Sequence, residues 1–84
     1  MDYYRIGQRA RAFRRAQDLS QEELAEKIGI SITHMSHIET GNTKLSLSVF
    51  FRLSQALGVG MDDLLREGSS DRSARLLELE EVLA

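Results

Sequence analysis

The 84-residue sequence contains no cysteine, no proline and no tryptophan. The absence of cysteine excludes a disulfide framework and any metal site built from thiolates. Aromatic residues make up 6% of the chain, so the core has to be built mainly from leucine, isoleucine and alanine. A chain of this length holds one domain with a modest core and not an enzyme-sized cleft between domains. This composition is typical of a helical bundle.

Long apolar runs are also missing. No stretch approaches the ~20 consecutive apolar residues that a membrane-spanning helix needs. The polar start MDYYRIGQR is unlike a secretory signal. We therefore expect a cytoplasmic protein without a membrane partner.

The chain as a whole lacks the basic excess that is typical of nucleic-acid-binding domains, because its formal net charge is -2. The charges are unevenly distributed, however. Residues 1–44 hold seven basic and six acidic side chains, whereas residues 45–84 hold four basic and seven acidic ones. The acidity is thus mainly C-terminal. Five arginines before Ala16 can form a local basic patch, namely Arg5, Arg9, Arg11, Arg14 and Arg15.

The most informative stretch is SQEELAEKIGISITHMSHIE, which predicts two helices joined by a tight turn. Ser20 followed by Glu23 forms a capping-box pattern that begins the first of these helices. Gly29 can adopt the positive φ that ends a helix. Ser31 can then cap a second helix over residues 32–40.

The two sides of this second helix differ in character. At about 100° per residue, Met35 and Ile38 fall on the side that we expect to enter the core. The opposite side is nearly uncharged and carries hydrogen-bonding or methyl groups, which suits the edges of DNA bases better than a solvated surface. This displayed set consists of Ile32, Thr33, Ser36 and His37.

The segments SQEELAEKIGIS, SITHMSHIETG and LSQALGV together resemble the helix-turn-helix domain of the phage repressor, Cro and xenobiotic-response-element family. The resemblance covers roughly residues 6–65. It implies an all-α, compact, five-helix lambda-repressor-like DNA-binding domain over residues 1–66, whose third helix enters the major groove. It also implies a sequence-specific regulator of transcription, a repressor, that binds double-stranded DNA as a homodimer.

The resemblance further assigns roles to individual residues. Arg14 and Glu39 match a structural ion pair that joins the first helix to the third. The base-facing positions of the recognition helix match Ile32, Thr33, Ser36 and His37. Contacts with the DNA backbone are expected from residues around that helix, namely Gln21, Ser31, His34, Asn42, Thr43 and Lys44. Arg9 and Arg11 are further candidates for the backbone.

The remaining elements follow from the same start and stop signals. They predict helices over residues 3–16 and 61–66, and a fourth helix that starts at Ser46 or Ser48 and stops at Gly58. Residues 67–84 predict a linker and a C-terminal amphipathic helix over 72–83, with Leu76, Leu79 and Leu83 on one side. This apolar stripe must either fold back on its own domain or pack against a second copy or another protein.

Catalytic and metal-binding patterns are weak. His34 and His37 head about 60° apart on the helix, and no third ligand has suitable spacing. No glycine-rich phosphate loop is present, and the serines lie where capping explains them. We therefore expect no enzyme, no metal and no cofactor. The alternative is a protein-interaction module or antitoxin-like component with the same fold and weak or no DNA binding, which the net charge and the apolar C-terminal helix favour.

Overall fold

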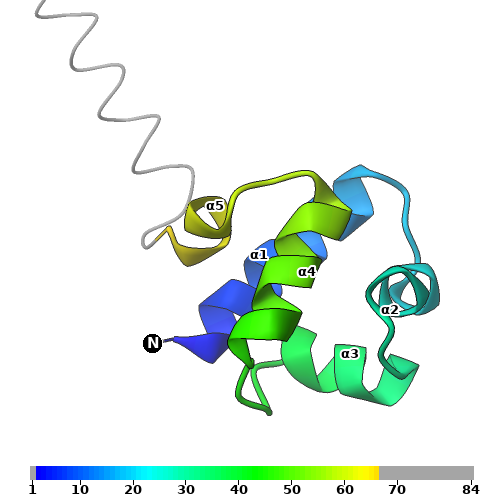
Figure 1. Cartoon of the computed structure of the whole chain (residues 1–84), viewed down its shortest axis with the longest axis horizontal. Coiled ribbons are helices and arrows are strands. Elements are labelled where there is room, and N and C mark those ends of the chain that lie inside the picture. The colour runs from blue at the N-terminus through cyan, green and yellow to red at the C-terminus, as the bar shows by residue number, and fades with distance from the viewer. Residues whose placement is uncertain (1, 67–84) are drawn as a thin grey trace, which may run out of the picture.

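The computed structural model describes residues 2–66, which form five α-helices and, over that range, no strand (Figure 1). The predicted all-α architecture is thus confirmed. The linker and the C-terminal helix predicted for residues 67–84 lie outside the described residues. In chain order the helices are α1 (Tyr3–Ala16), α2 (Gln21–Ile28), α3 (Ile32–Glu39), α4 (Leu47–Leu57) and α5 (Met61–Leu65).

Serine caps begin three of the helices. At the start of α2, the Glu23 amide donates to the Ser20 hydroxyl at 3.0 Å, and the Glu23 carboxylate accepts from the Ser20 amide at 2.9 Å. This is the reciprocal capping box that the sequence predicts. Ser31 and Ser46 cap α3 and α4 by accepting the amide three residues further on. The fourth helix therefore starts from Ser46 and not from Ser48.

The turn between α2 and α3 depends on Gly29, which has a φ of +77°. Residues with a Cβ atom rarely adopt this left-handed conformation, so glycine ends α2 at low cost. Helix α3 ends one residue earlier than predicted, because Thr40 is its C-cap. The Thr40 hydroxyl donates to the Ser36 carbonyl at 2.9 Å. This bond satisfies one of the carbonyl groups that a helix end leaves free.

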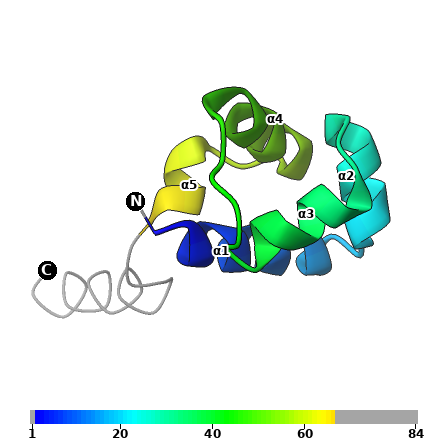
Figure 2. The same ribbon diagram turned by 90° about the horizontal axis from the view of Figure 1, so that it is seen from below.

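All five helices contribute to one apolar core, and α3 covers one side of it. Helix α3 packs against α1 and α2. In Figure 1 it lies along the lower edge of the molecule, and Figure 2, seen from below, shows it in front of the other helices. Its outer side is thus left uncovered by the other helices of residues 2–66. The buried apolar residues are Ile6, Ala10, Leu24, Ala25, Ile28, Met35, Ile38, Val49, Phe50, Leu53, Leu57 and Leu64.

Helix α1 crosses the C-terminal end of α3 at very close range. Gly7 is buried there, and a Cβ atom added to it would overlap the Ile38 carbonyl oxygen and lie 2.8 Å from that of Glu39. The Gln8 side chain donates to the Glu39 carbonyl at 2.9 Å. Only glycine permits such an approach of two backbones. The position of α3 is therefore fixed by α1 as well as by the turn that precedes it.

Long-range side-chain contacts hold α5 and α4 against α1. The Arg9 Nε atom donates to the Asp63 carbonyl at 2.6 Å, and its guanidinium lies 5.5 Å from the centre of the Phe13 ring. Arg9 therefore ties α1 to α5, a role that differs from the backbone contact considered from the sequence. Gln17 donates to the Leu57 carbonyl at 2.6 Å.

None of the helices in residues 2–66 is long and apolar enough to cross a membrane.

Candidate nucleic-acid interface

Helix α3 separates core residues from displayed residues as its periodicity predicts. Met35 and Ile38 are fully buried against the other helices. On the outer side Thr33 and His37 are exposed and Ser36 is half-buried. A hydroxyl group can donate and accept hydrogen bonds, and a neutral imidazole has one nitrogen for each task. The outer side of α3 therefore offers directional, uncharged groups.

The N-terminal end of α3 is suited to an anion. The Ser31 hydroxyl oxygen accepts from the His34 amide at 3.0 Å, which leaves the hydroxyl proton free to donate. Unpaired amides and the helix dipole at such an end favour negative charge. His34 lies half-buried at the flank of the helix.

Ile32 lies at an acidic edge of this surface. It borders a shallow hollow between α2 and α3 that Glu22 and Glu26 also line. Two carboxylates repel phosphate groups, and each of them is exposed. The uncharged centre of the displayed side is therefore formed by Thr33, Ser36 and His37.

The loop after α3 folds back on the end of that helix. The Asn42 amide donates to the His37 carbonyl at 2.8 Å, and the Asn42 side chain donates to the Thr40 hydroxyl at 3.1 Å. Thr43 is half-buried, and Lys44 is exposed. Within residues 2–66 the ammonium group of Lys44 forms no ion pair. A phosphate group can therefore approach the Lys44 ammonium group without displacing a carboxylate.

A buried hydrogen-bond network joins α1, α2 and the end of α3. The Glu39 side chain is 2% exposed, and the Arg14 guanidinium meets its carboxylate in a fork at 2.8 and 3.1 Å. Arg14 also donates to the Leu19 carbonyl at 2.7 Å, just before the Ser20 cap. Such forked, charge-assisted bonds are short and geometrically specific. The pair expected from the sequence thus fixes α3 to α1 and to the start of α2.

Gln21 is the third member of this network. Its Nε2 atom donates to the Glu39 carboxylate at 3.2 Å. The side chain keeps its carbonyl oxygen and one N–H for another partner. The sequence predicts a contact of Gln21 with the DNA backbone but does not reveal its bond to Glu39 or the bond from Gln8, because both depend on distances across the fold.

Ionisation and metal binding add little to this surface. The backbone amide of Ser20, and then its hydroxyl, lower the pKa of the Glu23 carboxyl from its ordinary value of 4.5. Among the described residues, no three histidine, aspartate or glutamate side chains come together in a way that could hold a metal ion.

Comparison with known proteins identifies the fold family. Residues 11–64, which include all of α2, α3 and α4, match the model of a helix-turn-helix family. The chain belongs to the helix-turn-helix family of the phage-repressor and Cro type. Helices α2 and α3, joined by the turn at Gly29, both lie within the matched residues.

Three relatives illustrate this membership. Control protein C.BamHI of Bacillus amyloliquefaciens is 40% identical over 61 residues, which are 71% of this chain and 75% of that protein. An uncharacterized transcriptional regulator in the ATPase CF(0) region of Rhodospirillum rubrum is 39% identical over 57 residues, 68% of this chain and 53% of the relative. The solution structure of the DNA-binding domain of the P22 c2 repressor superposes with a TM-score of 0.73 and is 30% identical, covering 83% of this chain and 92% of that domain.

The chain spans about half the length of the Rhodospirillum relative. The matches confirm the predicted fold and family. They also confirm the class of function at the level of this domain, which is that of DNA-binding transcriptional regulators and not of enzymes.

Proposed function

We propose that this protein is a sequence-specific regulator of transcription, acting as a repressor, that places α3 in the major groove of double-stranded DNA. The observation that carries the proposal is the outer side of α3, which is uncovered and uncharged and is held in place by the Arg14–Glu39 pair. The major groove is about 12 Å wide and admits an α-helix. A rigidly held helix can present each of its outer side chains to one base pair in a fixed register.

Base reading is assigned to the outer side of α3. His37 and the two hydroxyl groups of Thr33 and Ser36 can donate to or accept from base edges. The methyl groups of Ile32 suit contact with a thymine methyl group. None of the four positions carries glutamine, asparagine or arginine, so the base preference has to come from these shorter side chains.

Backbone contacts are assigned to the two ends of α3. Ser31, His34 and Gln21 lie at its N-terminal end or at the start of α2, and Asn42, Thr43 and Lys44 follow its C-terminal end. Phosphate contacts at both ends of a recognition helix would fix its register on the duplex. Lys44 supplies the full positive charge in this set.

The proposal includes a homodimer and a cytoplasmic location. Readers of this type bind two half-sites through a twofold axis, which sets two recognition helices about 34 Å apart. One observation favours the alternative of a protein-interaction module with weak or no DNA binding, namely the carboxylates of Glu22 and Glu26 beside Ile32. In that case residues 72–83 would be the segment that binds a protein partner.

Two single substitutions test the assignment of base and backbone contacts. His37→Ala removes a base-reading group and should lower the preference for the best base at one position by about 1–3 kcal/mol. Lys44→Ala removes a phosphate contact and should weaken binding to all sequences alike, with a salt slope smaller by about one. Both effects are measured by competition among labelled duplexes at several salt concentrations.

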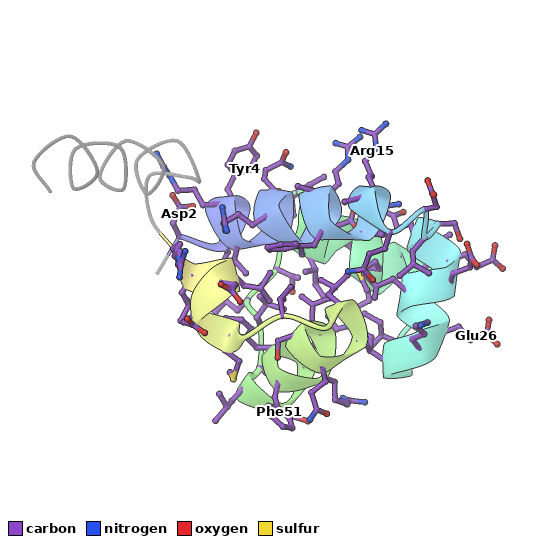
Figure 3. The ribbon with its side chains drawn as sticks, turned by 90° about the horizontal axis from the view of Figure 1, so that it is seen from above. Asp2, Tyr4, Arg15, Glu26 and Phe51 are labelled. Carbon is purple, nitrogen blue, oxygen red and sulfur yellow. The ribbon has the colours of Figure 1, made fainter. Side chains whose placement is uncertain are left out.

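Arg15→Ala is the matched control, because it also removes one positive charge but from the outer side of α1 (Figure 3). It should leave base preference unchanged and affinity nearly so. An equal loss on every sequence for His37→Ala would remove His37 from the base-reading set.

A further inference from the structure

An open groove of about 840 Å³ lies beside the N-terminal turn of α1, between that turn, Gly41 and α5. Its surface is largely apolar, with Tyr4 59% exposed and Leu65 45% exposed. Clefts of this size can receive several side chains, since drug-sized molecules occupy about 300–1,000 Å³. The groove plays no part in the DNA contacts proposed above.

The chain leaves the described fold at this groove. Arg66, the last described residue, is one of the residues that line it. The five residues 67–71 can span at most about 17 Å, so the segment that follows begins close to the groove. A helix over residues 72–83 would be about 18 Å long. A short connection of this kind lets the segment turn back on its own domain.

The chemistry of the segment complements that of the groove. Leu76, Leu79 and Leu83 form an apolar stripe on the helical pattern, and Glu80 lies beside it, whereas Glu78 and Glu81 fall on the opposite side. The groove offers apolar side chains on its surface, and Asp2, Arg5 and Arg66 are among the residues that line it. The stripe can therefore match the apolar part of the groove, with Glu80 on the same side of the helix as the stripe.

The two arginines that line the groove are only loosely engaged within the described fold. The guanidinium of Arg5 lies 3.4 Å from Asp2, and that of Arg66 lies 3.9 Å from Asp63. Both arginine side chains are about half exposed. Exposed pairs of this kind contribute little, so either arginine can turn to another carboxylate at small cost.

We propose that residues 72–83 dock as a helix in this groove of their own chain, with the leucine stripe against Tyr4 and Leu65. The Glu80 carboxylate, beside the stripe, then lies toward the arginines that line the groove. Docking removes exposed apolar surface from both partners, which is the driving force. If the segment docks in this way, the groove is filled by residues of the same chain and not by a second copy.

The lack of cysteine makes this proposal testable by cross-linking. The double variant Tyr4→Cys/Leu79→Cys places one thiol in the groove and one on the stripe. A disulfide needs Cα atoms within about 7 Å of each other, so it reports docking directly. We expect a monomeric disulfide that forms roughly tenfold faster than in an undocked pair, because docking raises the effective concentration above that of a flexible linker.

Phe51→Cys/Leu79→Cys is the control pair. Phe51 is 49% exposed, like the groove residues, but it points away from the molecule on the side opposite to Tyr4 (Figure 3). Equal rates of disulfide formation in the two pairs would overturn the proposal. A disulfide-linked dimer of the Tyr4→Cys/Leu79→Cys protein would also overturn it, because a second copy would then occupy the groove.

A measurement without cysteines keeps the proposal testable if a double variant fails to fold. In the full chain, Leu79→Gln should speed the hydrogen exchange of the α5 amides, because it weakens the covering segment. Ala74→Gln, which lies on the other side of the same helical pattern, should not. Unchanged exchange in Leu79→Gln would contradict docking. Neither experiment requires DNA, so failure here is distinct from failure of the regulator proposal.

Discussion

Glu39 is a buried carboxylate whose partners come from two other helices. Arg14 on α1 and Gln21 on α2 donate to its carboxylate, and Gln8 on α1 donates to its main-chain carbonyl. A charge removed from water needs such partners to be tolerated. The same bonds fix the end of α3 against α1 and α2. The buried residue Glu39 therefore controls the position of the side chains that are exposed on the outer side of α3.

Removal of one partner should be costly. Arg14→Leu leaves the Glu39 carboxylate buried without its counter-charge and should lower the free energy of unfolding by about 3–5 kcal/mol. Urea denaturation measures this loss. The double variant Arg14→Leu/Glu39→Leu should regain much of it, because no unpaired charge remains. Arg15→Leu, on the exposed side of α1, should change stability by less than about 0.5 kcal/mol. A loss below about 1 kcal/mol for Arg14→Leu would show that the network is not structural.

The capping box makes the free energy of unfolding depend on pH through the ionisation of Glu23. Hydrogen bonds to Ser20 lower the pKa of Glu23 in the folded state from 4.5. The stability that Glu23 contributes is therefore fully present above that value and is lost as the pH falls through the lowered pKa. We expect the unfolding free energy of Glu23→Gln to fall less between pH 7 and pH 3 than that of the parent protein. Parallel pH profiles for the two proteins would contradict this account.

At the scale of elements, capping residues carry most of the predictable information. Ser20, Gly29 and Ser31 locate the two helices of the motif to within one residue, because each of them acts on backbone groups no more than five positions away. The buried side of α3 is predictable for a similar reason, since Met35 and Ile38 follow from helical spacing alone. Helix caps and buried helix faces can therefore be predicted from a single sequence, because they depend on residues that are close together in the chain.

Contacts across the fold are not predictable in this way. Gly7 looks like an unfavourable residue in the middle of a helix until the carbonyls of Ile38 and Glu39 are seen against it. The positive charge of Arg9 suits a phosphate contact, but in the fold its guanidinium donates to the Asp63 carbonyl. The candidate site shows the same limit, because the use of Gln21 by Glu39 depends on how three helices meet.

The close packing of α1 on α3 reverses the usual effect of an alanine substitution. Ala is favoured over Gly within a helix by about 1 kcal/mol. Gly7→Ala should instead destabilise the protein by about 1–3 kcal/mol, because its methyl group would overlap the end of α3. It should also weaken specific DNA binding more than non-specific binding, since α3 is displaced. Thermal unfolding and duplex competition measure the two effects.

Ala12→Gly serves as the comparison, because Ala12 is exposed on the same helix. It should cost about 1 kcal/mol through helix propensity and leave base preference unchanged. Stabilisation by Gly7→Ala would show that α1 and α3 are not in close contact.

At the scale of the whole molecule, the charge is divided between two regions. Residues 2–66 carry nine basic and eight acidic side chains, and residues 67–84 carry two and five, which together give the net charge of -2. A domain with so small an excess of positive charge gains little from long-range attraction to DNA. Its affinity must come from contacts at the ends of α3, and the specificity from the outer side of that helix.

The most direct test of the account is the selection of binding sites from random double-stranded DNA by the purified protein, read by mobility shift at about 50 and 200 mM salt. We predict enrichment of a palindrome whose half-sites lie about 10 base pairs apart, centre to centre, with binding that weakens at the higher salt. The absence of any enriched site and of any binding at the lower salt would contradict the assignment of α3 as a base-reading helix.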